Sequence, residues 1–473
     1  MTEMDEPDTF RPGWRIWTIF LVLCMLSFMA SIDSTVITTS LPTVTREVGG
    51  ASQLANIFGR RNPLFVAITL FTLGSGLAGG AHNVGMLIVG RTIQDLGSGG
   101  LYVLAVLSTA AIGTTIGPII GGALAQENRR WVFWINLPVM GLGLLTIILA
   151  LDVQYRRSAT WLHALSRIDM LGNAIFIPPS TAIFFGLIMG GQPGYPWKSW
   201  RVILPLVLGV IGWVAFHVHQ ASPICREPSM PTRLFKNRTS AAGFLMIFLA
   251  SVIMQALGYF LPVYFQAVKG TTPLMSGVSF LPFALAIIPF GGLAGAFMSK
   301  TGLYRPLHMV GFALSATGAG LFSILREDSS RGAWIGFQVI ASGGTGLVFT
   351  ATLPSTLAAL PESDVAVATG TYSFIRSLGM VWGATVAAIA FNGQVDSHLD
   401  LVADPEVRQL LANGGTYTFQ VIEVYELALR NTWLVFVGVA CLGFLVAFVE
   451  KHVELRKDHS TEFISRRKGG KGE

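Results

Sequence analysis

The sequence predicts an all-α polytopic membrane protein, and three observations support this fold class. The 473-residue chain is 52% hydrophobic and only 12% charged, whereas soluble domains carry about 25% charged residues. Its mean hydropathy is +0.59. The apolar residues form blocks of about twenty, the length with which an α-helix crosses the hydrocarbon core of a bilayer. Because backbone polar groups cannot stay unpaired in hydrocarbon, we expect these blocks to be helices.

The apolar blocks, taken in order along the chain, predict about thirteen membrane spans. These spans lie near residues 14–41, 62–81, 83–104, 106–125, 131–151, 168–191, 200–220, 239–267, 274–299, 305–325, 332–358, 365–392 and 431–450. We divide the chain into a cytoplasmic N-terminal tail, an N-terminal bundle, linking and central spans, a C-terminal bundle and a basic cytoplasmic tail. The corresponding residues are 1–13, 14–151, 152–267, 268–450 and 451–473.

The basic residues predict the orientation of these spans. They mark alternate short loops and the C-terminal tail, which places those segments in the cytoplasm by the positive-inside rule. The loop residues are Arg60, Arg61, Arg156, Arg157, Arg167, Arg226, Arg233, Lys236, Arg238, Lys300 and Arg305. The net charge of +6 therefore reflects topology and does not predict binding to nucleic acid. The sequon at Asn237 falls on the cytoplasmic side, so we expect it to stay unglycosylated.

Composition and motifs argue against several chemical functions. The three cysteines are far apart and form neither a metal-binding pattern nor a disulfide framework. The eight histidines are scattered, whereas an integral membrane enzyme needs a polar catalytic cluster. No nucleotide-binding GxxxxGK[ST] loop occurs, which argues against an ATP-driven pump. We therefore predict no catalytic residue, no metal and no cofactor.

Four charged residues lie away from the ends of the predicted spans, namely Asp33, Arg91, Asp95 and Arg376. A charge at the centre of a membrane helix costs about 2.5–3.5 kcal/mol on insertion scales, so each one needs an explanation. Arg91 and Asp95 are four residues apart, so they can neutralise each other on one helix face. Under the functional interpretation, Asp33 or Asp95 exchanges protons and Arg91 tunes the pKa. Under the alternative interpretation, the charges form a structural ion pair and a polar cluster between helices.

A second informative segment is GTTIGPIIGG at residues 113–122. Pro118 removes a backbone hydrogen bond and bends the helix. The glycines around it, Gly113, Gly117, Gly121 and Gly122, allow close contact between helices. By itself this pattern also fits a simple packing seam.

Taken together, these motifs resemble the major facilitator superfamily. Residues 113–122 look like its antiporter motif, and LANIFGRR at 54–61 is similar to part of its cytoplasmic loop motif, with Gly59, Arg60 and Arg61. GRTIQDLGSGG at 90–100 resembles the fourth-helix motif, whose arginine is implicated in proton coupling. RWVFWINLP at 130–138 is similar to the signature of the fourteen-span drug:proton antiporters, and segments 190–200 and 259–266 look like its fungal members.

The resemblance implies the major facilitator fold, with two helical bundles and fourteen spans. It implies a secondary transporter that exports a hydrophobic small molecule, such as a fungal metabolite, mycotoxin or drug, in exchange for protons. The proton gradient then replaces any cofactor, and proton coupling falls to Asp33, Arg91 and Asp95. We expect Asn136, Gln255, Tyr259 and Arg376 to face the substrate cavity. We also expect a monomer in the plasma membrane, with a vacuolar or vesicular membrane as the alternative.

Two departures from the family pattern keep other functions open. Residues 43–58 contain no apolar block, although the family has its second span there, and the cytoplasmic loop near residue 105 is almost missing. Asp95 stands where the family usually has glycine. The alternatives are therefore an uptake carrier of the same superfamily, or a truncated and inactive version of the efflux pump.

Overall fold

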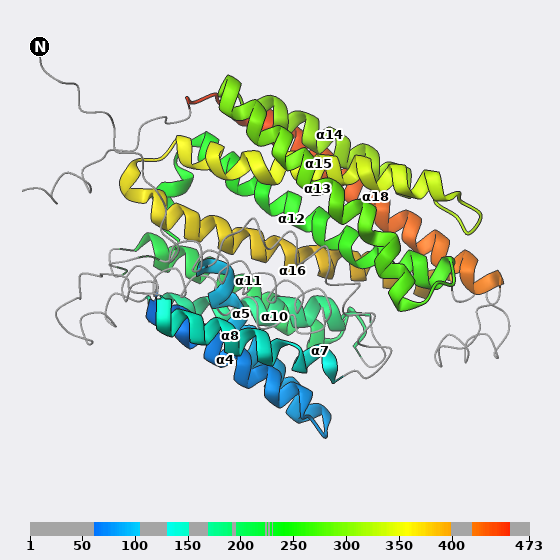
Figure 1. Cartoon of the computed structure of the whole chain (residues 1–473), viewed down its shortest axis with the longest axis horizontal. Helices are drawn as coiled ribbons and strands as arrows, with labels where there is room; N and C mark the ends of the chain where they lie inside the picture. Colours follow the sequence, from blue (N-terminus) through cyan, green and yellow to red (C-terminus); the bar gives the residue numbers. More distant parts are fainter. Residues whose placement is uncertain are drawn as a thin grey trace, which may run out of the picture.

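The computed structural model describes residues 61–104, 130–150, 169–191, 195–222, 225, 228, 230–398 and 419–454 (Figure 1). Within these ranges every regular element is helical, as an all-α fold requires. The long helices are α4 (Arg61–Gly79), α5 (Val84–Leu104), α8 (Asn136–Ala150), α10 (Met170–Met189), α11 (Trp200–Ala221), α12 (Arg238–Val263), α13 (Pro273–Thr301), α14 (Arg305–Phe322), α15 (Arg331–Ala358), α16 (Val365–His398) and α18 (Phe419–Val449). The short elements are α7 (Trp131–Trp134), the 3₁₀ turns η1 (Thr232–Phe235) and η3 (Glu362–Asp364), and a π-helical turn η2 (Tyr264–Val268) that extends α12.

Seven of the described helices are long and apolar enough to cross a bilayer: α10, α11, α12 with η2, α13, α15, α16 and α18. The predicted spans at 14–41 and 106–125 lie outside the described residues, so the total of thirteen stays a prediction. Two helices are longer than the predicted spans, because α16 continues to His398 and α18 begins at Phe419. Hydropathy detects only the apolar part of a helix, and these ends carry polar residues.

The described helices form two groups (Figure 1). One group contains α12, α13, α14, α15, α16 and α18, in which α12 packs on α15, α16 and α18. The other contains α4, α5, α7 and α8, with α5 packed along α4. The α10–α11 hairpin contacts α16 of the first group. These contacts describe the packing, and the domain boundaries drawn from the sequence stay a prediction.

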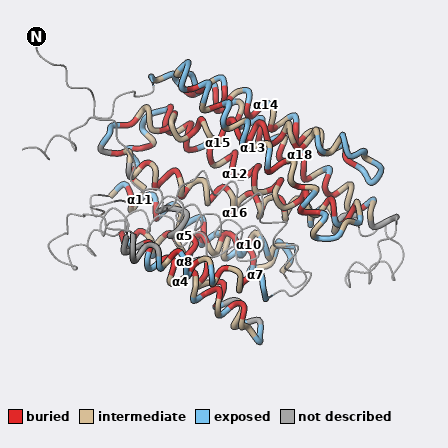
Figure 2. Tube along the Cα trace, viewed as in Figure 1, coloured by how far each residue is buried: buried red, intermediate tan, exposed pale blue. Residues whose placement is uncertain are grey.

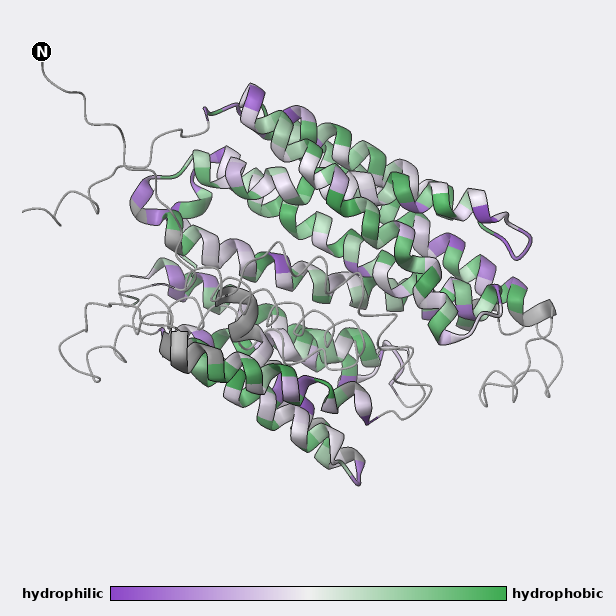
Figure 3. Cartoon of the chain, in the orientation of Figure 1, coloured by the Kyte–Doolittle hydropathy of each residue, from purple (hydrophilic) through white to green (hydrophobic). Residues whose placement is uncertain are grey.

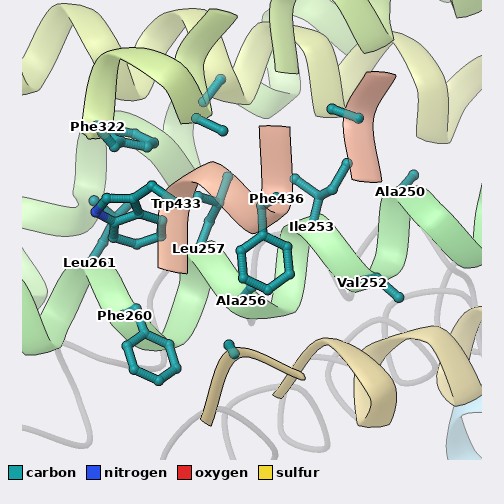
Figure 4. Close-up of a cluster of buried hydrophobic side chains, with 14 of the residues drawn as sticks. Ala250, Val252, Ile253, Ala256, Leu257, Phe260, Leu261, Phe322, Trp433 and Phe436 are labelled. Atoms are coloured by element: carbon teal, nitrogen blue, oxygen red, sulfur yellow. The ribbon is translucent and has the colours of Figure 1, made fainter. Parts of the chain in front are cut away.

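The largest buried cluster lies where α12, α14 and α18 meet (Figure 4). Trp433 and Phe436 on α18 are fully buried between Leu257 on α12 and Phe322 on α14. Lipid tails are as apolar as these side chains, so the hydrophobic effect contributes little to helix association within a bilayer. Close packing holds the helices together instead, and Figure 2 shows buried residues concentrated along the inner helix faces.

The outer helix faces are apolar, as expected for contact with lipid. Hydrophobic residues cover the helix midsections and polar residues gather near the helix ends (Figure 3). On α11, Val207, Ile211, Val214 and Val218 are all exposed at helical spacing. Trp200 at the start of α11 is 69% exposed, which fits a residue at the membrane–water interface.

The loops predicted to be cytoplasmic contact one another. The Thr239 hydroxyl, near the start of α12, donates to the Lys451 carbonyl at 3.0 Å, and the Tyr304 hydroxyl donates to the same carbonyl at 3.1 Å. Arg233 in η1 pairs with Asp364 in η3, with 3.0 Å between Nη2 and Oδ1. Segments far apart in sequence therefore meet at one end of the bundle, and the placement of these loops in the cytoplasm stays a prediction.

Candidate functional site

Glycines bring α4 and α5 into backbone contact. A Cβ atom at Gly97 would lie 2.3 Å from the Phe71 nitrogen, and one at Gly74 would lie 2.1 Å from the Gln94 nitrogen. Backbone atoms cannot move aside as a flexible side chain can, so both positions require glycine at this helix separation. The same close approach places the polar side chains of the two helices next to each other.

The candidate site is a buried polar cluster around Arg91, which is only 5% exposed. Arg91 Nη1 donates to Gln94 Oε1 at 2.6 Å, one turn along α5. Gln94 Nε2 donates to Ser75 Oγ on α4 at 2.7 Å, and Asn136 Nδ2 on α8 approaches the same hydroxyl at 3.4 Å. The Arg91 guanidinium carbon also lies 5.4 Å from the centre of the Phe133 ring. Three helices are therefore joined through one buried cation (the Arg91 cluster).

A buried cation of this kind has clear chemical consequences. The guanidinium group of arginine is a permanent cation in proteins, so the cluster holds a positive charge among apolar helices. Hydrogen bonds and the Phe133 ring compensate part of the cost of burying this charge. A nearby carboxylate would have its proton affinity lowered by the same charge. The cluster is therefore suited to tuning a proton-binding group.

Several predicted residues cannot be compared with the structure. Asp33, Gly59, Arg60 and the antiporter motif residues Gly113, Gly117, Pro118, Gly121 and Gly122 lie outside the described residues. Arg61 and Asp95 belong to α4 and α5, but their side chains are not described. The predicted neutralisation of Arg91 by Asp95 therefore stays a prediction, beside the observed bond to Gln94.

The four predicted cavity residues fall on different parts of the fold. Asn136 belongs to the Arg91 cluster. Gln255 and Tyr259 lie on α12, which packs on α16, and both are partly buried. Arg376 on α16 stacks over the Phe349 ring of α15, with 5.3 Å between the guanidinium carbon and the ring centre. Three of the four residues thus stand on two helices in mutual contact.

A second buried charged group joins α14 to the segment after α18. His308 Nδ1 lies 2.7 Å from Glu450 Oε2, and both side chains are 0% exposed. Thr352 Oγ1 donates to the Val348 carbonyl at 2.5 Å and lies 3.4 Å from His308 Nε2. Because its one proton is used, this hydroxyl can only accept from the ring. His308 Nε2 then donates to Thr352, and both ring nitrogens have a hydrogen-bond partner.

A third polar group lies at the base of the α10–α11 hairpin. Asp169 caps α10 by accepting from the Gly172 nitrogen at 2.7 Å, and it also accepts from Gln220 Nε2 at 2.5 Å. Burial would raise the pKa of Asp169, but these hydrogen bonds and that of His219 outweigh burial and lower the pKa. Burial, together with the Asp169 charge, raises the pKa of the Cys225 thiol to about 11.

Sequence reasoning missed most partners in these groups. Gln94 had a local signal, because it lies three residues after Arg91 on the same helix face. Ser75 had no such signal, because serines are common in apolar segments and nothing in the sequence distinguishes this one. His308 and Glu450 are 142 residues apart in sequence, and Asp169 and His219 are 50 apart. Only the packing of the helices brings such pairs together.

Comparison with solved structures identifies the fold. The fold resembles an auto-inhibited POT family peptide transporter, with a TM-score of 0.58, 14% identity, and coverage of 94% of this chain and 99% of that one. It also resembles a bacterial homologue of the human lysosomal transporter Spinster, with a TM-score of 0.54 and 15% identity. The match covers 93% of this chain and 97% of that one. The described helices are therefore arranged as in these helical membrane proteins, and the likeness shows a shared fold.

Sequence comparison then gives the family. The Major Facilitator Superfamily profile matches residues 105–384, more than half of the chain, and that of the sugar (and other) transporters matches residues 27–116. The chain is 44% identical to the MFS efflux transporter aclA of Aspergillus oryzae, over 98% of this chain and 94% of that protein. It is 38% identical to the Acurin A biosynthesis cluster MFS-type transporter of Aspergillus aculeatus, over 96% of this chain and 92% of that protein. The chain belongs to the major facilitator superfamily.

The alignment with the Aspergillus oryzae protein spans 517 positions, although this chain has 473 residues. That relative therefore contains residues that this chain lacks. The comparison does not place the gaps, so the absence of the second span stays a prediction.

Proposed function

We propose that this protein is an efflux pump that exports a hydrophobic small molecule of fungal secondary metabolism in exchange for protons. The observation that carries the proposal is 44% identity to an MFS efflux transporter across nearly the whole chain. Relatedness to a transporter from a biosynthesis cluster supports the substrate class. The plasma membrane is the proposed location, and the monomer is the proposed working form.

The Arg91 cluster supports proton exchange as the driving reaction. A permanent cation held between α4, α5 and α8 favours the ionised form of a nearby carboxylate and so sets when that carboxylate releases its proton. We assign this carboxylate to Asp33 or Asp95. Alternating access would move the two helical bundles about a central cavity, and Gln255, Tyr259 and Arg376 are the proposed substrate contacts on the C-terminal side.

The proposal is tested with purified protein in lipid vesicles that contain a fluorescent hydrophobic dye. An imposed pH gradient should drive dye transport, and a protonophore should abolish that transport. Dye transport that ignores the protonophore would disprove proton coupling. Flux measured in both directions separates an exporter from an uptake carrier.

Substitutions test which residues couple proton movement to substrate transport. Arg91→Gln should remove gradient-driven transport, because the neutral side chain no longer stabilises the ionised carboxylate. Gln94→Leu should reduce it, because Arg91 then loses a hydrogen-bond partner on its own helix. Arg201→Gln is the matched control, since Arg201 is an exposed arginine beside Trp200 at the start of α11. Equal loss of transport in the Arg201 variant would contradict a specific role for Arg91.

A second candidate, a truncated and inactive transporter, is favoured by the 517-position alignment. Sequencing the transcript tests it directly, because a message that encodes the missing segments would show that the 473-residue chain lacks parts of the encoded protein. A topology reporter attached after Arg61 would show whether that loop reaches the cytoplasm without a second span. Robust gradient-driven transport by the chain as given would exclude this candidate.

A further inference from the structure

Three different metal-binding side chains gather at the base of the α10–α11 hairpin. A carboxylate oxygen of Asp169, the imidazole of His219 and the Cys225 sulfur each place one ligand atom within 4.8 Å of the other two. Asp169 precedes α10 and His219 lies in the last turn of α11. Cys225 returns to them because its nitrogen bonds to the Ser222 carbonyl at 3.2 Å, in the turn that follows α11.

The arrangement is both buried and held in place. The Asp169 side chain is 3% exposed and the His219 side chain 10% exposed. The Gly172 nitrogen fixes one oxygen of Asp169, and Gln220 Nε2 fixes the other. Gln220 is itself fixed, because its Oε1 accepts from the Met230 nitrogen at 3.1 Å. Supporting hydrogen bonds of this kind orient the ligands of protein metal sites.

The spacing agrees with the size of a tetrahedral site. His219 Nε2 and Asp169 Oδ1 are 3.2 Å apart. Nitrogen and oxygen ligands that both lie about 2.0–2.1 Å from a tetrahedral zinc ion are separated by about 3.3–3.4 Å. These two side chains therefore need to move little to bind a zinc ion. The Cys225 sulfur, within 4.8 Å of both ligand atoms, has to move closer to reach the ion.

We propose that Asp169, His219 and Cys225 bind a zinc ion at the cytoplasmic base of this hairpin. The ligand set selects the metal, since magnesium and calcium prefer oxygen ligands alone, whereas zinc accepts sulfur, nitrogen and oxygen together. A thiolate and a carboxylate also cancel the double charge of the ion. The neutral complex suits a partly buried position, where an uncompensated charge is costly. The bound ion would fasten the segment after α11 to both helices of the hairpin.

The competing interpretation is a helix cap without a metal, in which His219, Gln220 and Cys225 only hydrogen-bond to Asp169. Cobalt distinguishes the two, because it takes the place of zinc and gives a thiolate-to-metal absorption band together with the visible spectrum of a tetrahedral site. We would titrate cobalt into the full chain, purified in detergent without a polyhistidine tag and stripped with a chelator. We expect one equivalent to bind per chain and zinc to displace it.

Matched variants test the ligands. Cys225→Ser should abolish the thiolate band, and His219→Gln should weaken zinc binding by more than the roughly 10–100-fold lost with a supporting hydrogen bond. Cys441→Ser is the control for the cysteine, because Cys441 is an exposed cysteine on α18. His217→Gln is the control for the histidine, because the His217 ring packs against Trp213 and Phe216 instead. Both controls should bind cobalt as the wild type does.

A measurement on the wild-type chain avoids any effect of substitution on folding. Zinc should protect Cys225 from alkylation by a maleimide and leave the extent of alkylation at Cys441 unchanged, as read by mass spectrometry of the digested protein. The proposal is overturned if cobalt gives no thiolate band, if the band survives in Cys225→Ser, or if zinc leaves the alkylation of Cys225 unchanged.

Discussion

The buried pair between His308 and Glu450 allows a quantitative test of how the C-terminal bundle is held together. The two side chains are 0% exposed and meet at 2.7 Å, and Glu450 Oε1 has no hydrogen-bond partner among the described residues. Substituting one partner leaves the other as an uncompensated buried polar group. Breaking a buried ion pair in this way costs about 3–5 kcal/mol. An exposed pair would cost only about 0–1 kcal/mol, so the two situations are well separated.

We expect Glu450→Leu to destabilise the protein by about 3–5 kcal/mol and His308→Leu to do the same. The double variant should recover much of this loss, because replacing both members with apolar residues removes the buried charges as well as their attraction. The measurement is unfolding of the purified protein in detergent, followed by tryptophan fluorescence. Glu454→Gln is the control, because Glu454 is an exposed carboxylate four residues further along.

The reasoning is refuted if the losses of the two single variants simply add in the double variant. Additive losses would mean that the two side chains do not interact energetically. A loss below about 1 kcal/mol in both single variants would show instead that water reaches the pair.

Two further perturbations test the packing and the cytoplasmic contacts. Gly97→Ala should cost about 1–3 kcal/mol by overpacking, because its Cβ would meet the Phe71 backbone. Gly141→Ala is the control and should leave thermal stability unchanged or slightly raised, because no described atom lies within 4 Å of the added Cβ. Equal losses in the two variants would contradict the packing argument. Arg233→Ala should cost only about 0.2–1 kcal/mol, because the Arg233 side chain is 53% exposed although Asp364 is buried. The measurement is thermal unfolding at low and high salt, and a larger, salt-independent loss would contradict the assignment of a screened surface pair.

The charged groups show where prediction from sequence ended. Arg91 was found from sequence alone, because a cation in an apolar segment is rare and costly wherever the segment packs. Its partners on other helices, Ser75 and Asn136, were not identified as such, because they depend on how α5 lies against α4 and α8. Gln94 could be predicted as a neighbour of Arg91, because helical spacing places the two residues side by side in any fold, but its bond to Ser75 could not.

The sequence by itself determined that the chain is helical and embedded in a membrane, because hydropathy and the need to pair the backbone act within each segment. It also predicts which loops share one side, since that depends on the positions of the basic residues. Only the tertiary structure decided that His308 meets Glu450 and that Asp169 meets His219 and Cys225. These contacts depend on which helices pack together and at what register, and that choice comes from the fit between whole helix surfaces, which no single segment encodes.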